Sequence, residues 1–386
     1  MLRALISLGQ VLLVAPAVYS SVIALWGLRT PSRRDGAGSD RRVRAIVAAH
    51  NEAAVIGGIA SDLAGQEYPE DLLSSVVVAD RCSDDTADIA AAFVDVAERR
   101  SGTGGKGAAI AWYLEEHPLR EDEAVIVLDA DNRIDQGYVR AVAAEFDVGS
   151  HVIQTYLDVA NPDGSVLATA GALTYWASNR MVQLARSNLG WSCDLGGTGM
   201  AFTGRALDDA GGFGDDLTDD LALNVRLNLA GYRATWLHHV RVYDEKPTDA
   251  RSTIAQRARW VRGKRDVQRT YGATLVKQAL LLRQPALLDL AFRLYNPGRS
   301  FIALSMGGLT LAAAAFPAIG LWPWWVLGTV TGVVVLLPTV FLAVEGVPVR
   351  YIARYPFVTV LAVMWPPIRV ASRLVTGWQR TQHEGA

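Results

Sequence analysis

Two long stretches without any charged residue limit how this chain can fold. They are residues 4–28 and 300–344. A helix that crosses a bilayer needs about 20 consecutive apolar residues, so the first stretch is long enough for one such helix and the second for two. Charged residues, 20% of the whole chain, lie between and beyond these stretches. The pattern predicts a soluble domain held between membrane segments.

The first apolar stretch can be interpreted as a membrane helix or as a cleaved signal peptide. Ala15–Ala17 and Tyr19–Ser21 weakly resemble cleavage sites. The apolar part of a signal peptide is about 7–15 residues long. Residues 5–28 exceed that length, which favours a retained N-terminal transmembrane helix within residues 1–29.

Basic residues around this helix predict its orientation. Arg3 alone precedes the helix, and several arginines follow it, namely Arg29, Arg33, Arg34, Arg41, Arg42 and Arg44. Because basic residues favour the cytoplasmic side of a membrane, we expect the domain that follows to be cytosolic. The sequence thus predicts a multi-pass protein of the plasma membrane.

The second apolar stretch belongs to a predicted C-terminal membrane region, residues 277–386. We expect transmembrane helices at about 301–319 and 324–344, because a Gly-Leu-Trp-Pro sequence interrupts the apolar run there. Residues 356–380 hold a shorter apolar segment with two adjacent prolines, which favours a re-entrant or interfacial helix over a third span. Residues 277–293 are amphipathic and predict a helix on the membrane surface or, alternatively, in the core.

Short apolar runs alternate with helical segments between residues 43 and 270, which predicts one α/β domain. The expected strands are Val43–Ala49, Ser75–Ala79 and Ala124–Leu128, and the expected helices are Val55–Leu63, Asp84–Val94 and Lys106–Glu115. This order predicts a parallel sheet with helices on both faces, and ligands bind beyond the carboxyl ends of the strands in such a fold. Residues 30–40, rich in Gly, Ser, Pro and Arg, are the expected linker.

Charge and cysteine content exclude some classes of function. The formal net charge is −2, so the composition does not indicate a nucleic-acid partner. The two cysteines, Cys82 and Cys193, cannot build a disulfide framework, and they lie in no Cys/His cluster with zinc-ligand spacing.

Carboxylates follow two of the predicted strands directly. Asp80 follows the second strand, and Asp129 and Asp131 follow the third. Carboxylates at one edge of a parallel sheet repel one another unless a cation lies between them, and a divalent cation bound to a phosphate-bearing substrate meets that need. The alternative is that each aspartate only caps the helix after it.

Lys106 lies in the glycine-rich segment Thr103–Gly107 and is a candidate phosphate contact. The segment is no P-loop, because Arg100 and Gly107 occupy the positions where that motif requires Gly and Ser or Thr. Its glycines also match a dinucleotide fingerprint, but that fingerprint belongs after the first strand and this segment follows the second predicted helix.

Two charged clusters come later in the chain. The first contains Asp215, Asp216, Asp219 and Asp220. Its aspartates precede a predicted helix, Leu221–Ala230, and either stabilise the helix dipole or provide a general base. The second cluster, Arg257–Arg265, either binds anionic lipid or combines phosphate contacts with a sugar-stacking tryptophan.

These motifs coincide in order and spacing with those of a known family. The chain resembles the inverting family 2 glycosyltransferases, within them the membrane-embedded branch of cellulose, hyaluronan, chitin and poly-N-acetylglucosamine synthases. The resemblance runs from about Val43 to Arg265 and implies a GT-A fold, a mixed sheet with helices on both faces, with transmembrane helices attached. It is carried by Ala49–Glu52, Ala79–Thr86, Lys106, Asp129–Asp131, Gly197–Met200, Thr218–Asp220 and Gln256–Trp260. Asp219 departs from the Glu that the family has there.

The resemblance also implies residue roles. Asp220 is the expected catalytic base, and Asp131 with Asp129 the expected site for Mg²⁺ or Mn²⁺. The expected donor-binding residues are Ala49, Glu52, Asp80, Lys106, Asp129 and Arg259. The expected acceptor-binding residues are Trp260, Gly199, Asp219 and Gln256.

The implied activity is transfer of a sugar from a nucleotide-diphosphate donor, expected to be UDP-linked, to a saccharide or lipid-linked acceptor with a β-glycosidic product. Processive polysaccharide synthesis is favoured by Gln256–Trp260, whereas single transfer to a lipid is favoured by the few predicted spans. A non-catalytic nucleotide-sugar sensor is a further alternative, against which the intact Asp220 and Trp260 argue.

Overall fold

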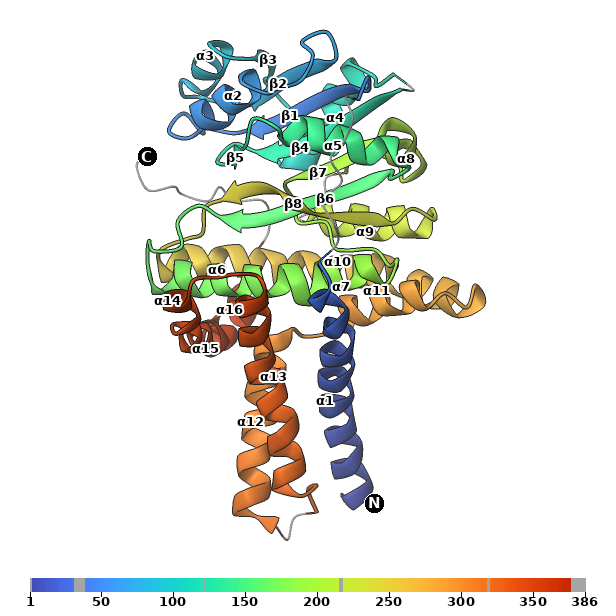
Figure 1. Cartoon of the computed structure of the whole chain (residues 1–386), viewed down its shortest axis with the longest axis vertical. Helices are drawn as coiled ribbons and strands as arrows, with labels where there is room; N and C mark the ends of the chain where they lie inside the picture. Colours follow the sequence, from blue (N-terminus) through green and yellow to red (C-terminus); the bar gives the residue numbers. More distant parts are fainter. Residues whose placement is uncertain (1, 31–38, 121, 215–217, 318–319, 376–386) are drawn as a thin grey trace.

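The computed structural model describes residues 2–30, 39–120, 122–214, 218–317 and 320–375. A sheet with its covering helices lies at one end of the molecule, a layer of long helices follows, and three apolar helices extend away from that layer (Figure 1). Most of the predicted linker 30–40 and the end of the predicted segment 356–380 lie outside the described residues.

Strands of the described chain form one mixed sheet in the order β3-β2-β1-β4-β7-β6-β8-β5. Their bounds are β1 Arg42–Ala49, β2 Leu73–Asp80, β3 Asp95–Arg99, β4 Glu123–Asp129, β5 Arg133–Ile134, β6 Val152–Val159, β7 Met200–Thr203 and β8 Ala234–Asp244. Strands β2, β1 and β4 are parallel, as the alternating pattern predicts. Strand β3, which the pattern did not predict, is parallel to β2. Strand β7 is antiparallel to β4 and β6, so the parallel arrangement holds for the three predicted strands, and the sheet as a whole is mixed, which confirms the GT-A sheet.

The parallel strands end together at one edge of the sheet. Ala49 of β1 pairs with Ala79 of β2, and Ala48 pairs with Asp129 of β4. Asp80 and Asp129 therefore lie at the same edge. Alternate residues of a strand face opposite sides, and accordingly Val127 packs in one hydrophobic cluster and Leu128 in the cluster on the other face.

The helices that cover the parallel strands match the prediction with one exception. Helix α2 spans Ile56–Ala64 and α4 spans Lys106–Glu116. The predicted helix Asp84–Val94 is wrong at both ends, because α3 covers only Thr86–Ala91 and the strand β3 follows it. Most of β3 is exposed or half-buried, so this edge strand has no buried apolar run that would have marked it.

The remaining helices of the domain are α5 Tyr138–Asp147, α8 Gly204–Asp209 and α9 Asp219–Leu229. Below the sheet, α6 (Val166–Ser178) continues through the π-helical segment η2 (Asn179–Leu184) into α7 (Ala185–Asn188). The long helix α10 (Ala250–Leu281) lies in the same layer (Figure 1). This layer separates the sheet from the apolar helices.

The predicted surface segment 277–293 is divided between two helices. Its first part is the end of α10, and α11 begins anew at Pro285 and ends at Tyr295. Proline fixes its own backbone and lacks an amide hydrogen, so it starts a helix readily but cannot continue one.

Two helical segments of the described chain, Ile6–Leu28 and Trp324–Val344, are long and apolar enough to cross a membrane. The first comprises α1 (Leu2–Ala24) and the short 3-10 helix η1 (Leu25–Leu28), and the second is α13. Helix α11 and helix α12 (Arg299–Ala315) form a further candidate that is bent by 71° between them.

The last described part of the chain, where a re-entrant or interfacial helix was expected, forms a series of short helices. They are α14 Val349–Ile352, η4 Tyr355–Phe357, α15 Val358–Val363 and α16 Trp365–Ala371. They gather at the end of α12 and α13 that is nearest the domain (Figure 1).

Buried ion pairs join the apolar helices to the domain. Arg186 of α7 donates to both carboxylate oxygens of Asp289 in α11, at 2.7 and 2.9 Å, and Tyr19 of α1 donates to the same carboxylate at 2.8 Å. Arg180 of η2 pairs with Glu345, which directly follows α13. We call these five residues the junction.

Candidate active site

A pocket of about 750 Å³ opens at the carboxyl edge of the sheet. The lining includes all but one of the predicted site residues, namely Ala49, Glu52, Asp80, Lys106, Asp129, Asp131, Asp219, Asp220, Gln256, Arg259 and Trp260. The exception is Gly199, which packs against Thr155 and Val242 while its neighbours Gly197 and Thr198 line the pocket.

One end of the pocket is formed by the ends of β1 and β2. Asp80 is nearly buried, and its carboxylate accepts from Arg99 at 3.0 Å and from Arg81 at 2.8 Å. The ring of His50 contacts the backbone oxygen of Asp80 at 2.6 Å. The edge strand β3 supplies Arg99, so the strand that the sequence prediction missed holds this carboxylate in place.

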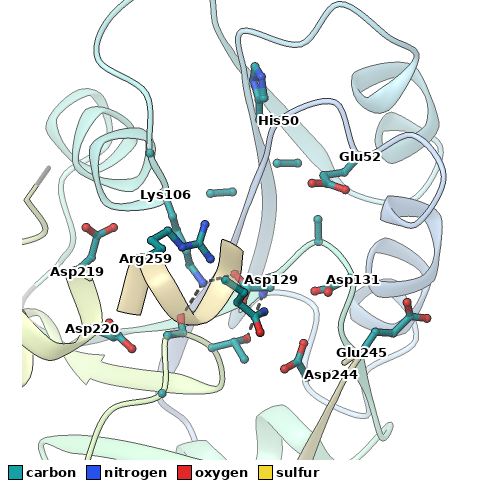
Figure 2. A pocket seen from close by; sticks show the side chains of 18 of the residues that line it. His50, Glu52, Lys106, Asp129, Asp131, Asp219, Asp220, Asp244, Glu245 and Arg259 are labelled. Atoms are coloured by element: carbon teal, nitrogen blue, oxygen red, sulfur yellow. Dashed lines mark hydrogen bonds and ion pairs between the residues drawn. The ribbon is translucent and has the colours of Figure 1, made fainter. Parts of the chain in front are cut away.

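Lys106 lies at the centre of the pocket, at the start of α4. Its ammonium group donates to Asp129 at 2.5 Å and to the backbone oxygen of Gly197 at 2.7 Å. In Figure 2, Lys106 and Arg259 lie between Asp219 and Asp220 on one side and Asp131, Asp244 and Glu245 on the other. Two cations are thus placed among carboxylates, at a position that suits a diphosphate.

Asp131 lies where several carboxylates meet. Burial is the main cause that raises its pKa well above the usual range, and the charges of Asp244 and Asp129 add to it. No group of three or more His, Cys, Asp or Glu side chains that could hold a metal ion occurs in the part of the chain that the structure describes. Mg²⁺ is usually held by one or two carboxylates and by substrate phosphates. Asp131, which lies near the negative charges of Asp129 and Asp244, therefore fits a divalent cation that binds together with a nucleotide.

Asp219 and Asp220 begin helix α9 and have different partners. Asp219 accepts the backbone N–H of Gly107 at 2.6 Å, which fixes the start of α4 beside it. Asp220 accepts from the backbone N–H of Leu221 at 2.8 Å. Burial raises the pKa of Asp220 and the charge of Asp129 adds to it, whereas the Leu221 amide and Lys106 lower it. Asp215 and Asp216 lie outside the described residues.

The basic segment Arg257–Arg265 lies within α10, and the periodicity of the helix directs its residues to different sides. Gln256, Arg259 and Trp260 line the pocket. Burial lowers the pKa of Arg259, against the nearby charges of Asp129, Asp220 and Asp219. Helix α10 approaches α9 closely because Gly263 lies against the side chain of Thr218, where a Cβ would meet atoms at 2.3 Å.

Several lining residues were missed by the sequence prediction. They are Asn161, Tyr175, Phe213 and the segment 244–249, among others. Asp244 ends β8 and pairs with Lys246, whose ammonium group lies 3.7 Å from the centre of the Tyr175 ring. A carboxylate at a strand end is the signal that identified Asp80, so the same rule would have found Asp244. Tyr175 lies inside α6 and carries no such signal.

The sheet and the strand-end pocket define a GT-A fold, the architecture of nucleotide-diphospho-sugar transferases. Residues 41–263 match the family described as glycosyltransferase like family 2, and the chain belongs to that family.

Curated relatives and a solved structure are similar to this chain. It is 32% identical over 232 residues to a beta-monoglucosyldiacylglycerol synthase of Trichormus variabilis, covering 57% of this chain and 48% of the relative. It is 31% identical over 227 residues to the synthase of that name from Synechocystis, covering 56% and 47%. The chain thus spans about half the length of the curated relatives it matches. A mannosyltransferase of Pyrobaculum calidifontis, solved with GDP-Man and Mn²⁺, shares the fold with a TM-score of 0.58 and 21% identity, covering 93% of this chain and 99% of that one. Membership of the polymer-synthase branch stays a prediction.

Proposed function

We propose that the protein transfers one sugar from a nucleoside-diphosphate donor to a hydroxyl group of a membrane lipid, with inversion at the anomeric carbon. The observation that carries the proposal is that Lys106, Arg259, Asp220 and Asp131 line the same pocket, with the two cations between the two carboxylates. The names of the curated relatives support a lipid acceptor over a growing polysaccharide.

Asp220 acts as the general base in this proposal. As the acceptor oxygen bonds to the anomeric carbon, its proton passes to the Asp220 carboxylate. The bond from the anomeric carbon to the diphosphate breaks at the same time, and the diphosphate leaves with the electron pair. Attack from the face opposite the diphosphate turns an α-linked donor into a β-linked product. The raised pKa of Asp220 makes its carboxylate a stronger base.

Lys106 and Arg259 stabilise the negative charge that develops on the diphosphate. Lys106 is already oriented by Asp129 and by the Gly197 carbonyl, so little reorganisation is needed when the donor binds. Asp131, with Asp129 nearby, would hold a divalent cation that supplies further charge stabilisation to the leaving group when it is bound. UDP is the proposed nucleotide carrier.

The acceptor enters at the end of the pocket lined by α10. Trp260 offers a flat apolar ring to the acceptor, and Gln256 lies one turn before it. We assign residues 43–270 to the cytosolic catalytic domain, and α1, α12 and α13 to transmembrane helices that keep the pocket near the lipid surface. The short helices after α13 lie at that surface.

A product assay tests the proposal. Membranes containing the protein are incubated with radiolabelled UDP-glucose or GDP-mannose and diacylglycerol, and the products are separated by thin-layer chromatography and on a gel. We expect one labelled lipid with a single sugar, absent from the Asp220→Asn variant. A ladder of long products would instead support the second candidate, polysaccharide synthesis, which the Gln256–Trp260 motif favours. Donor binding without release of the nucleoside diphosphate would support a sensor and contradict the transfer.

A further inference from the structure

Three arginines meet on a side of α10 that does not line the pocket. Arg265 belongs to α10, Arg369 to α16 and Arg373 to the turn that follows α16. Helix α10 packs against α16, which brings Arg265 and Arg369 to the same contact between helices, and Arg373 follows α16 by two residues. Partial burial, followed by the charges of Arg265 and Arg373, lowers the pKa of Arg369, in agreement with this placement. We call them the basic cluster.

The basic cluster forms no ion pair with a carboxylate within the described residues. Helix α10 carries one acidic residue, Asp266, and that carboxylate pairs with Arg262 at 2.9 Å and Arg269 at 3.9 Å. Residues 349–375 contain no Asp or Glu. Lys264, next to the cluster, is held by backbone oxygens of Arg293 and Asn296 at 2.9 and 2.7 Å. Repulsion among the three arginines is therefore balanced by none of these groups, and a bound anion would balance it.

The basic cluster lies where the apolar helices meet the domain. Arg369 stacks over the ring of Trp365 at 4.3 Å, and that ring contacts Phe301 in the first turn of α12, with 5.8 Å between ring centres. Val370 and Leu374 beside the cluster are 61% and 76% exposed. Arginine, an indole ring and exposed aliphatic side chains together are typical of the boundary between lipid headgroups and acyl chains. Figure 1 shows α16 at the domain end of α12 and α13.

We propose that the basic cluster binds the phosphate group of an anionic phospholipid in the leaflet that faces the domain. Arginine binds phosphate through paired hydrogen bonds, and the neighbouring aliphatic side chains contact the acyl chains. A zwitterionic headgroup carries its own cation and attracts the cluster less. Arg265 lies about 120° around the helix from Arg259, so a lipid bound there also holds the helix that lines the pocket. That consequence alone rests on the proposed function.

Quenching of Trp365 fluorescence tests the site without any donor or acceptor. The full chain is reconstituted into phosphatidylcholine vesicles that contain a small fraction of brominated phosphatidylglycerol or of brominated phosphatidylcholine. The signal of the Trp365→Phe variant is subtracted to isolate Trp365. We expect half-maximal quenching at a much lower fraction of brominated phosphatidylglycerol than of brominated phosphatidylcholine. In Arg265→Gln/Arg369→Gln the phosphatidylglycerol fraction needed should rise about thirtyfold, since each basic residue contributes about 1 kcal/mol.

Two control variants separate the site from folding and from general charge. Arg265→Lys/Arg369→Lys keeps the charge and should keep most of the preference for phosphatidylglycerol over phosphatidylcholine. Arg262→Gln removes one charge from the same helix at a residue paired with Asp266, and should leave the preference unchanged.

Three outcomes would overturn the proposal. The first is equal quenching by the two brominated lipids. The second is a loss of the phosphatidylglycerol preference in Arg262→Gln as large as in Arg265→Gln/Arg369→Gln. The third is displacement of the brominated lipid by inorganic phosphate but not by chloride at the same ionic strength, which would assign the cluster to a soluble phosphate. The quenching experiment does not measure glycosyl transfer. A negative quenching result therefore does not contradict the proposed activity, and a protein without transfer activity can still show the lipid preference.

Discussion

The pocket and the junction both hold charged side chains away from bulk water, yet the pKa values of their carboxyl groups shift in opposite directions. In the junction, burial by itself would raise the pKa of Glu345, but hydrogen bonding to His238 and the charge of Arg180 lower it overall. In the pocket, burial prevails, because it raises the pKa of Asp220 and Asp131 and lowers that of Arg259.

This difference is expected if the junction has a structural role and the pocket binds a ligand. Glu345 contacts Arg180, His238 at 3.5 Å and Arg241 at 3.9 Å, so its charge is balanced within the chain. In the pocket the pKa of Asp131 is raised, so a divalent cation bound together with a nucleotide diphosphate would stabilise the ionised form of this carboxylate. Changes in the pocket should therefore affect activity more than stability, and changes in the junction should do the reverse.

The largest effect on activity is expected from Asp220→Asn. Asparagine keeps the shape of the side chain but cannot accept the proton, and general-base catalysis is typically worth about 10²–10⁴-fold. The turnover number should fall by that factor, while UDP affinity and melting temperature stay nearly unchanged. Turnover is measured as UDP released per folded molecule.

Asp219→Asn is the matched control for the base. The asparagine oxygen can still accept the N–H of Gly107, so the start of α4 stays in place and turnover should fall much less. The raised pKa of Asp220 also predicts that the acid limb of the pH–rate profile lies above about 3.9, the usual value for aspartate. Equal loss of turnover in both variants would contradict the assignment of the base.

The largest effect on stability is expected from Glu345→Gln. Removing one partner of a buried ion pair costs about 3–5 kcal/mol of unfolding free energy, because Arg180 then stays buried with less compensation. Thermal unfolding of the purified protein in detergent measures the change. A lowered carboxyl pKa stabilises the fold above the unfolded value of about 4.3, and this contribution is lost as the pH falls through the folded value. The difference in unfolding free energy between the wild-type protein and Glu345→Gln should therefore become smaller in acid.

Asp147→Asn provides the comparison for that measurement. Asp147 pairs with Arg41 at 3.3 Å, but its side chain is 42% exposed, and such surface pairs contribute about 0–1 kcal/mol. A melting temperature lowered as much by Asp147→Asn as by Glu345→Gln would mean that burial does not distinguish the two pairs.

A smaller effect on ligand binding is expected from Asp131→Asn. Loss of one carboxylate should weaken binding of Mn²⁺ in the presence of UDP by at least about tenfold, within the range seen when groups around metal sites are removed. The affinity is measured by titrating free Mn²⁺ with electron paramagnetic resonance. Asp135→Asn changes an exposed aspartate directly after β5, four residues from Asp131, and should have no effect. Full activity in excess EDTA would contradict the metal site and leave the charge stabilisation to Lys106 and Arg259.

The smallest effect is expected from Trp260→Ala. Loss of the ring should raise the KM for the acceptor about tenfold, since aromatic contacts are worth about 0.5–1.5 kcal/mol beyond area burial. UDP affinity should not change. Trp260→Phe, which keeps an aromatic ring, should have a KM for the acceptor close to that of the wild-type protein. If UDP affinity falls while the acceptor KM is constant, the ring contacts the donor.

Sequence reasoning found the parts of the pocket that follow regular elements. Asp80 and Asp129 were predicted because each ends a run of buried residues, and the strand register places both at one edge. Tyr175 was not found, because a tyrosine inside a helix looks the same whether it faces a pocket or the core. Gly199 was assigned from its motif, yet the residues around it line the pocket and it faces Thr155.

The sequence by itself determined the apolar stretches, the parallel strands and the carboxylates at their ends. These depend on periodicity and on neighbouring residues, which a local pattern records. Tertiary structure alone decided how the basic residues of α10 divide between the pocket and the basic cluster. It also decided that Tyr19 and Arg186 meet Asp289 across separations of 270 and 103 residues. Such contacts depend on the packing of the whole chain, because the energy of a buried charge is set by every group around it and not by its neighbours in sequence.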